Sequence, residues 1–233
     1  MNFFKEIYYK KYTKTSYSLS NVDLVINRIF SKKKNGIYID IGCNHPIKYN
    51  NTHLLHKKGW RGINIDLDEK SILEFNKIRK SDYNKQALIS NVSGKIKEIY
   101  FYHSRSAINT VSKELTDSRN NKPKKIKKEK STTINEIINN SPYKNEKINF
   151  MSIDIEDHEY EALINFNFDK YKIDIICVEC NDKSQKKLEI YNQDIEFVKN
   201  SKIYTLLTNN NYKLINWVNA DLIFARKNLN KSF

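Results

Sequence analysis

The stretch that decides the fold is residues 36–69, GIYIDIGCNHPIKYNNTHLLHKKGWRGINIDLDE. It starts with a β-rich run over 37–41 that ends in an acid, an isoleucine and a glycine. A predicted helix over 52–58 stops at a glycine, and a second β-rich run over 62–66 again ends in an acid. Two such runs joined by a helical crossover are typical of a parallel βαβ unit.

Helices and strands are predicted to alternate along the rest of the chain. The expected helices cover 69–78, 133–138, 159–166 and 194–209, and the expected strands cover 86–90, 96–102, 148–155, 173–179, 212–218 and 222–225. The pattern predicts a Rossmann-like α/β fold, with a mostly parallel sheet and a C-terminal antiparallel hairpin. We expect a helical lead-in over 1–35 and a single domain over 36–233.

Length and composition fit this fold. The chain has 233 residues, of which 39% are hydrophobic, and this is enough for one packed domain. No apolar run approaches the roughly 20 residues of a membrane span, and the N-terminus lacks the features of a signal peptide. A cytoplasmic protein is therefore expected. With only three cysteines a disulfide framework is not expected, and the CxxC of Cys177 and Cys180 is interpreted as part of a buried strand.

The net charge of +14 raises the possibility of a nucleic-acid partner. Lysine is abundant throughout the chain, however, which indicates a general compositional bias. The densest cluster, Lys122–Lys130, is predicted to lie in a solvated loop, with binding to an acidic surface, glycan or nucleic acid as the less favoured interpretation.

Acidic residues occur where four of the five main predicted strands end. They are Asp40, Asp66, the pair Asp154 and Glu156, and Glu179. Ligands of open α/β sheets bind outside the carboxyl ends of the strands, and strands are otherwise poor in acids. A cationic cofactor with ribose hydroxyls would account for this pattern, and the acid that ends the second strand is placed to accept both hydroxyls of a ribose.

The glycine pattern separates one cofactor from another. Nicotinamide and flavin enzymes use GxGxxG to surround a pyrophosphate with backbone amides. Here Gly42 is followed by Cys43, Asn44, His45 and Pro46, so the other two glycines are missing. S-adenosylmethionine has no pyrophosphate, and the sequence therefore favours it as the cofactor.

The same residues resemble the FkbM-type methyltransferases. Members typically show D-(I/V)-G-A-N after the first strand, then a helix start with Thr, then G-W-x-G and an acid; the matching residues are Asp40, Gly42, Asn44, Asn51, Thr52, Gly59, Trp60, Gly62 and Asp66. The segments 131–138, 148–166 and 175–179 also resemble the family, so the likeness covers about 36–179. Departures from the pattern include Cys43, Pro46, Ser152 and, in place of a glycine after the second acid of the fourth strand, Asp157.

The resemblance implies an S-adenosylmethionine-dependent O-methyltransferase that acts on hydroxyls of sugars, glycans or other natural products. It implies cofactor-binding roles for Asp40, Gly42, Asn44, Thr52, Asp66, Asp82, Ser90 and Asn91. It places Asp154 and Glu156 at the methyl-transfer centre, where these two residues and His158 are the candidate catalytic residues. A divalent metal held by Asp154, Glu156 and Glu179 is considered but not favoured, and no metal ligand is assigned.

Two other functions stay open. One is methylation of a nucleic acid, although the (N/D/S)-P-P-(Y/F) motif of many such enzymes is missing after the fourth strand. The other is a binding module with a methyltransferase-like fold and no activity, because fold does not guarantee function. The acceptor pocket is expected in the loops over 104–130 and 181–194. The sequence does not predict the oligomeric state.

Overall fold

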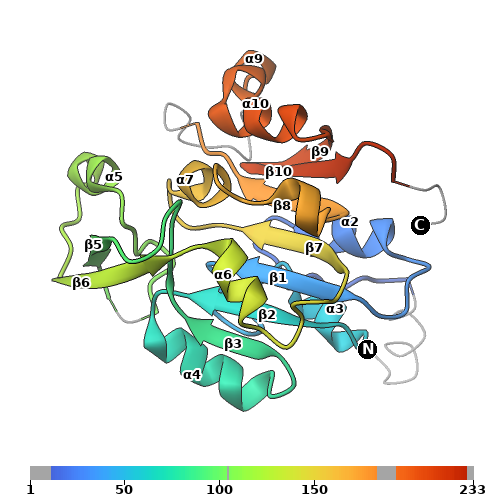
Figure 1. Cartoon of the computed structure of the whole chain (residues 1–233), viewed down its shortest axis with the longest axis horizontal. Helices are drawn as coiled ribbons and strands as arrows, with labels where there is room; N and C mark the ends of the chain where they lie inside the picture. Colours follow the sequence, from blue (N-terminus) through green and yellow to red (C-terminus); the bar gives the residue numbers. More distant parts are fainter. Residues whose placement is uncertain (1–11, 104, 183–192, 230–233) are drawn as a thin grey trace, which may run out of the picture.

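A computed structural model describes residues 12–103, 105–182 and 193–229 (Figure 1). Its centre is a seven-stranded sheet with the strand order β3-β2-β1-β7-β8-β10-β9. The strand bounds are β1 Ile37–Ile41, β2 Arg61–Asp66, β3 Tyr83–Gln86, β7 Ile148–Ile153, β8 Ile175–Glu179, β9 Tyr212–Val218 and β10 Asp221–Arg226. The first five strands in this order, β3, β2, β1, β7 and β8, pair with their neighbours in parallel. The pairs β8–β10 and β10–β9 are antiparallel. This confirms the predicted mostly parallel sheet with its antiparallel C-terminal strands.

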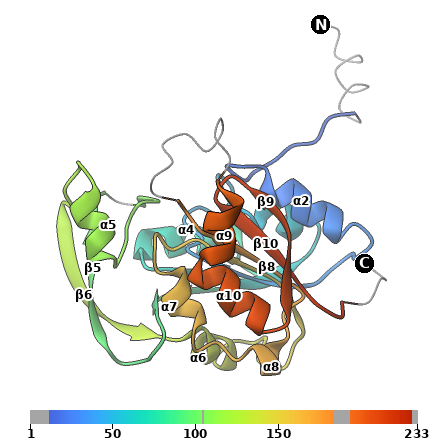
Figure 2. The same ribbon diagram turned by 90° about the horizontal axis from the view of Figure 1, so that it is seen from above.

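Helices cover both faces of this sheet (Figures 1 and 2). The helix bounds are α2 Val22–Ile29, α3 His53–Lys57, α4 Glu69–Ile78, α6 Ile134–Asn139, α7 Glu159–Leu163, α8 Phe168–Tyr171, α9 Ile195–Asn200 and α10 Lys202–Asn209. Side chains from α2 and α3 pack with Tyr38 and Trp60 on one face, whereas α6, α7, α8, α9 and α10 pack with Ile39 and Ile41 on the other. Because side chains alternate along a strand, β1 contributes to both cores.

The third strand differs from the prediction over 86–90. The strand that pairs with β2 is β3, four residues at the edge of the sheet, and none of its side chains is fully buried. The next residues form β4, Leu88–Ile89, which leaves this sheet and pairs with β6, Lys125–Thr132. An edge strand needs few apolar residues, so the apolar signal in the sequence marks the buried β4.

The prediction of a loop over Lys122–Lys130 was wrong. Most of this segment is β6, which pairs antiparallel with β5, Ile96–Phe101, after a short helix α5, Lys113–Ser118. The resulting three-stranded sheet β4-β6-β5 projects to one side of the molecule (Figure 2). Because most side chains of β6 face solvent, the strand shows no apolar alternation by which the sequence could reveal it.

Some predicted segments lie partly outside the described residues. Of the lead-in over 1–35, the structure describes the residues from 12 onward, including α2. Of the two predicted acceptor loops, Ser104 and residues 183–192 lie outside the described residues. Among the helices that the structure does describe, none has the length and apolar character needed to cross a membrane. The cytoplasmic location stays a prediction.

Candidate active site

A cavity opens where the parallel strands of the main sheet end. The ends of β1, β2 and β7 form its floor, and the segments 87–89 and 106–111 form its walls. Its lining residues are Ile41, Gly42, Asn44, Ile65, Asp66, Leu67, Ala87, Leu88, Ile89, Ser106, Ala107, Asn109, Val111, Asp154, Ile155, Glu156 and His158. The set combines an apolar wall with acidic groups, which suits a ligand with an aromatic ring and polar substituents.

The turn after β1 holds the strand ends together. Gly42 has a φ of +80° and donates its N–H to the carbonyl of Ile65 at 2.9 Å. A Cβ atom at this position would lie 1.7 Å from the carbonyl oxygen of Asp154. Only glycine therefore lets the ends of β1 and β7 approach so closely. Both Gly42 and Asn44, two of the predicted cofactor residues, line the cavity.

Asp66, at the end of β2, is fixed by two backbone donors. Its Oδ2 accepts the N–H of Asn44 at 2.8 Å, and its Oδ1 accepts the N–H of Asp68 at 2.7 Å. Its side chain also lines the cavity, although the residue is mostly buried. Burial raises the pKa of Asp66 to about 6, because the hydrogen bonds offset only part of the cost of placing the charge there.

Arg79, which the sequence analysis missed, is fully buried beside the turn. Its guanidinium donates to five oxygen acceptors, namely the carbonyl of Pro46 and the side chains of Tyr38, Asn50, Thr52 and Asn64. This network fixes residues 46–52 against β1 and β2. A lone arginine after a predicted helix gives no signal in a sequence that it is buried.

Three of the predicted cofactor residues lie in this network and not in the cavity wall. Asp40 accepts hydrogen bonds from the side chains of Asn50 at 2.9 Å and Thr52 at 2.7 Å. Asp82 accepts from Asn64 at 3.1 Å and from Tyr38. A direct contact of Asp40, Thr52 or Asp82 with a cofactor stays a prediction. Their observed contacts support the loop that carries Asn44.

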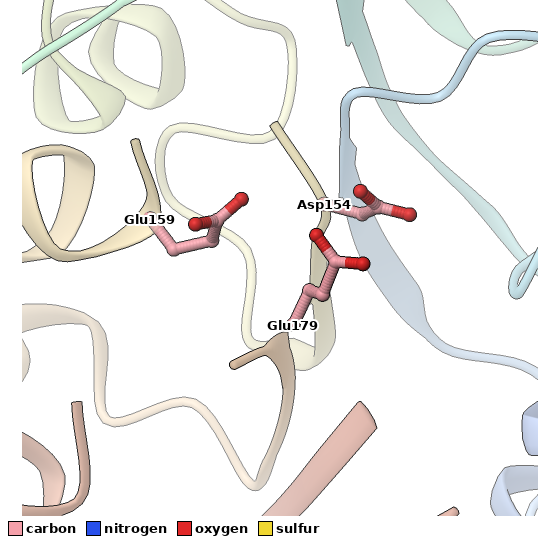
Figure 3. Close-up of side chains that lie close together, drawn as sticks. All are labelled: Asp154, Glu159 and Glu179. Atoms are coloured by element: carbon pink, nitrogen blue, oxygen red, sulfur yellow. The ribbon is translucent and has the colours of Figure 1, made fainter. Parts of the chain in front are cut away.

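Three carboxyl groups converge beyond the end of β7 (Figure 3). Oxygen atoms of Asp154, Glu159 and Glu179 all lie within 4.8 Å of one another. Burial raises the pKa of Asp154 well above its usual value, and the neighbouring carboxylates raise it further. The charge of Asp154 raises the pKa of Glu179, and burial raises that of Glu159 to about 7. At neutral pH Glu159 is therefore partly protonated, and the three groups titrate as a coupled set.

Glu156 is not one of these three converging groups, although its charge raises the pKa of Asp154. It forms an ion pair with Arg119 at 2.5 Å, and its carbonyl accepts a hydrogen bond from Thr110 at 2.7 Å. Both Glu156 and Asp157 have positive φ values, of 55° and 74°, so the chain turns sharply after β7. The turn brings Glu159 close to Asp154. The set of carboxylates considered for a cation therefore changes, because Glu159 takes the place of Glu156.

His158 follows this turn and is buried beside the cavity. Its Nε2 lies 3.2 Å from the hydroxyl of Ser90 and 3.2 Å from the Nζ of Lys97. Burial and the charge of Lys97 lower the pKa of His158 to about 4, so the ring is neutral at physiological pH.

Ser90 and Asn91 do not line the cavity; the preceding Ala87, Leu88 and Ile89 do. Their predicted role near an adenine stays untested.

A second cavity adjoins the first. It is lined by Leu115, Arg119, Glu156, Asp157, Glu159, Glu179 and Asn181. The two cavities share Glu156, and the three converging carboxyl groups lie along them. The walls supplied by the segments 106–111 and 115–119 were expected only as part of a broad loop region, because no apolar period marks them.

A match to a protein family shows which kind of domain carries this site. The model of the Methyltransferase FkbM domain matches residues 40–214, which is most of the chain. The chain belongs to the FkbM methyltransferase family. No curated protein and no solved structure matches the chain. The match begins at Asp40 and includes every residue that lines the two cavities, so this FkbM domain contains the whole site. Membership implies a methyltransferase with a cofactor of the S-adenosylmethionine type.

Proposed function

We propose that this FkbM methyltransferase transfers a methyl group from S-adenosylmethionine to a hydroxyl of a sugar, glycan or natural product. The observation that carries the proposal is that Asp66 and Asp154 lie in the wall of one cavity at the carboxyl ends of β2 and β7. This is the edge at which open α/β sheets bind their ligands. The residues that line the cavity fit this cofactor, because they offer one fixed carboxylate, an apolar wall and further acids for a cationic ligand.

Each group of residues has a distinct task in this proposal. The carboxylate of Asp66 accepts the ribose hydroxyls, and Ile65, Leu67, Leu88 and Ile89 supply the apolar wall against which the adenine packs. When bound, the cofactor supplies an electrophilic methyl group. The protein then has to hold a hydroxyl in line with that methyl and accept its proton, and positioning provides much of the acceleration.

Asp154 is the best placed of the three candidate bases. It lines the cavity, where burial and then the neighbouring carboxylates raise its pKa well above its usual value. Glu156 instead forms an ion pair with Arg119. The Nε2 of His158 already contacts the Ser90 hydroxyl and the Nζ of Lys97. A carboxylate with a raised pKa is a stronger base, which favours Asp154 for the proton transfer.

The first test is a calorimetric titration with S-adenosylhomocysteine. The wild type is expected to bind it, and Asp66→Ala is expected to weaken binding by about tenfold to a hundredfold because a charged hydrogen-bond partner is lost. Asp169→Ala, an exposed acid on α8, serves as the control and should bind like the wild type. Absence of binding by the wild type would overturn the proposal.

The raised pKa of Asp66 also predicts a pH dependence of cofactor binding. Only the ionised carboxylate accepts from both ribose hydroxyls, so affinity is full above the pKa of about 6 and falls below it. By linkage, the dissociation constant for S-adenosylhomocysteine should rise about tenfold between pH 7 and pH 5. In Asp66→Asn this dependence should disappear. An equal slope in both proteins would assign the titration to another group, such as Glu159.

A nucleic-acid acceptor is the second candidate, and the lysine-rich strand β6 favours it. This strand belongs to the small sheet that projects from the molecule (Figure 2). A groove on it is lined by Asp68, Lys70, Phe101, His103, Lys124, Lys125 and Lys127. A basic groove with an aromatic ring suits a nucleic-acid strand. A complex with RNA whose affinity falls steeply with salt, together with methylation of that RNA, would favour this acceptor over a sugar.

A further inference from the structure

Asn109 carries a buried donor that has no partner. The residue lies between β5 and α5, is 6% exposed and lines the cofactor cavity. Its Oδ1 accepts the N–H of Tyr102 at 3.0 Å, and this contact fixes which end of the amide is oxygen. Its Nδ2 is buried and, among the residues that the structure describes, finds no acceptor. A buried donor without an acceptor is destabilising, so its retention requires an explanation.

The backbone at Asn109 and at the next residue is held by hydrogen bonds. The N–H of Asn109 donates to Ser106 at 3.3 Å, and the next residue, Thr110, exchanges two backbone hydrogen bonds with Tyr100. The hydroxyl of Thr110 donates to the carbonyl of Glu156 at 2.7 Å. The backbone at Asn109 is thus fixed beside the cavity, with the amide oxygen bonded to Tyr102 and the amide nitrogen unpaired.

We infer that the Nδ2 of Asn109 donates a hydrogen bond to the nucleoside cofactor bound in this cavity. The inference rests on the proposed function, and the partner atom is a hydrogen-bond acceptor of the cofactor, such as a ring nitrogen or an oxygen. Asn109 lines the cavity that contains Asp66 and the apolar wall, and it does not line the adjoining cavity with Glu159 and Glu179. This placement assigns the donor to the cofactor and not to the methyl acceptor.

The test compares two isosteric substitutions in titrations with S-adenosylhomocysteine. Asn109→Asp keeps the oxygen that accepts from Tyr102 and replaces the amide donor with a carboxylate oxygen. Asn135→Asp is the matched control, because Asn135 also accepts a backbone N–H through Oδ1, from Asn167, and donates through Nδ2, to the carbonyl of Asn165. We expect about tenfold weaker binding for Asn109→Asp and unchanged binding for Asn135→Asp.

Asn109→Ala removes the same donor without adding a charge, and it replaces Asn109→Asp if the aspartate variant does not fold. Wild-type affinity in a folded Asn109 variant would overturn the inference, provided that the wild type binds. If the wild type itself does not bind S-adenosylhomocysteine, the proposed function fails instead, so the two failures are distinguishable. A loss of similar size in titrations with adenosine would place the partner atom on the nucleoside part of the cofactor.

Discussion

Replacing Arg79 with methionine is expected to lower the free energy of unfolding by about 3–5 kcal/mol, the usual cost of breaking a buried ionic network by removing one partner. The guanidinium is fully buried and has hydrogen bonds to five residues. Without it, the acceptor oxygens of Pro46, Asn50 and Thr52 lose their donor. The carboxylate of Asp40 also loses the positive charge that offsets part of the effect of its burial.

The loss should appear as a lower midpoint in urea denaturation followed by circular dichroism. Total stabilities of domains are about 5–15 kcal/mol, so a loss of this size is a large fraction of the whole. Arg28→Met on the exposed side of α2 is the control, and it should change stability by less than about 0.5 kcal/mol. A midpoint for Arg79→Met equal to that of the control would show that the network is not needed for stability.

Replacing Asp154 with asparagine is expected to reduce kcat by about 100-fold to 10,000-fold, which is the range that general acid–base catalysis contributes. The substitution keeps the shape of the side chain and removes its ability to accept a proton. Because the proposal assigns the ribose to Asp66, the affinity for S-adenosylhomocysteine should change by less than about threefold. It also removes the charge that contributes most to the raised pKa of Glu179, so the pKa of Glu179 should fall.

The measurement is methyl transfer to an acceptor identified by screening hydroxylated sugars, with and without magnesium. Asp169→Asn provides a control with the same chemical change on the surface of α8. A loss of activity in Asp154→Asn that excess magnesium restores would indicate a metal-binding role for this residue and not a role as base. Unchanged activity would exclude Asp154 from the proton transfer.

Much of the main sheet could be predicted because its strands are buried. The runs at β1, β7 and β8 are apolar, and each ends at or next to an acid, so both the strands and their functional edge are visible in the sequence. Gly42, Asp66 and Asp154 were placed at that edge from this pattern and Asn44 from the family resemblance, and all four line the cavity.

The other parts of the site depend on contacts that a local pattern does not encode. The sequence places Glu156 nearest to Asp154, but the positive φ values of Glu156 and Asp157 turn the chain and bring in Glu159. Asp40 ends a strand as expected, yet its partners are Asn50 and Thr52, within the network of a distant arginine. The segment 106–111 became part of the wall only because the ribbon of β5 and β6 folds back.

The contacts of Arg79 also have a consequence for the order in which the chain folds. They reach no further back than Tyr38, a separation of 41 residues, whereas β1 pairs with β7 across more than twice that distance. Closing a shorter loop costs less entropy, and local contacts form faster. During synthesis the segment from β1 to Arg79 can therefore associate while β7 is still absent. The turn around Asn44 can then take its shape before β7 and Asp154 arrive.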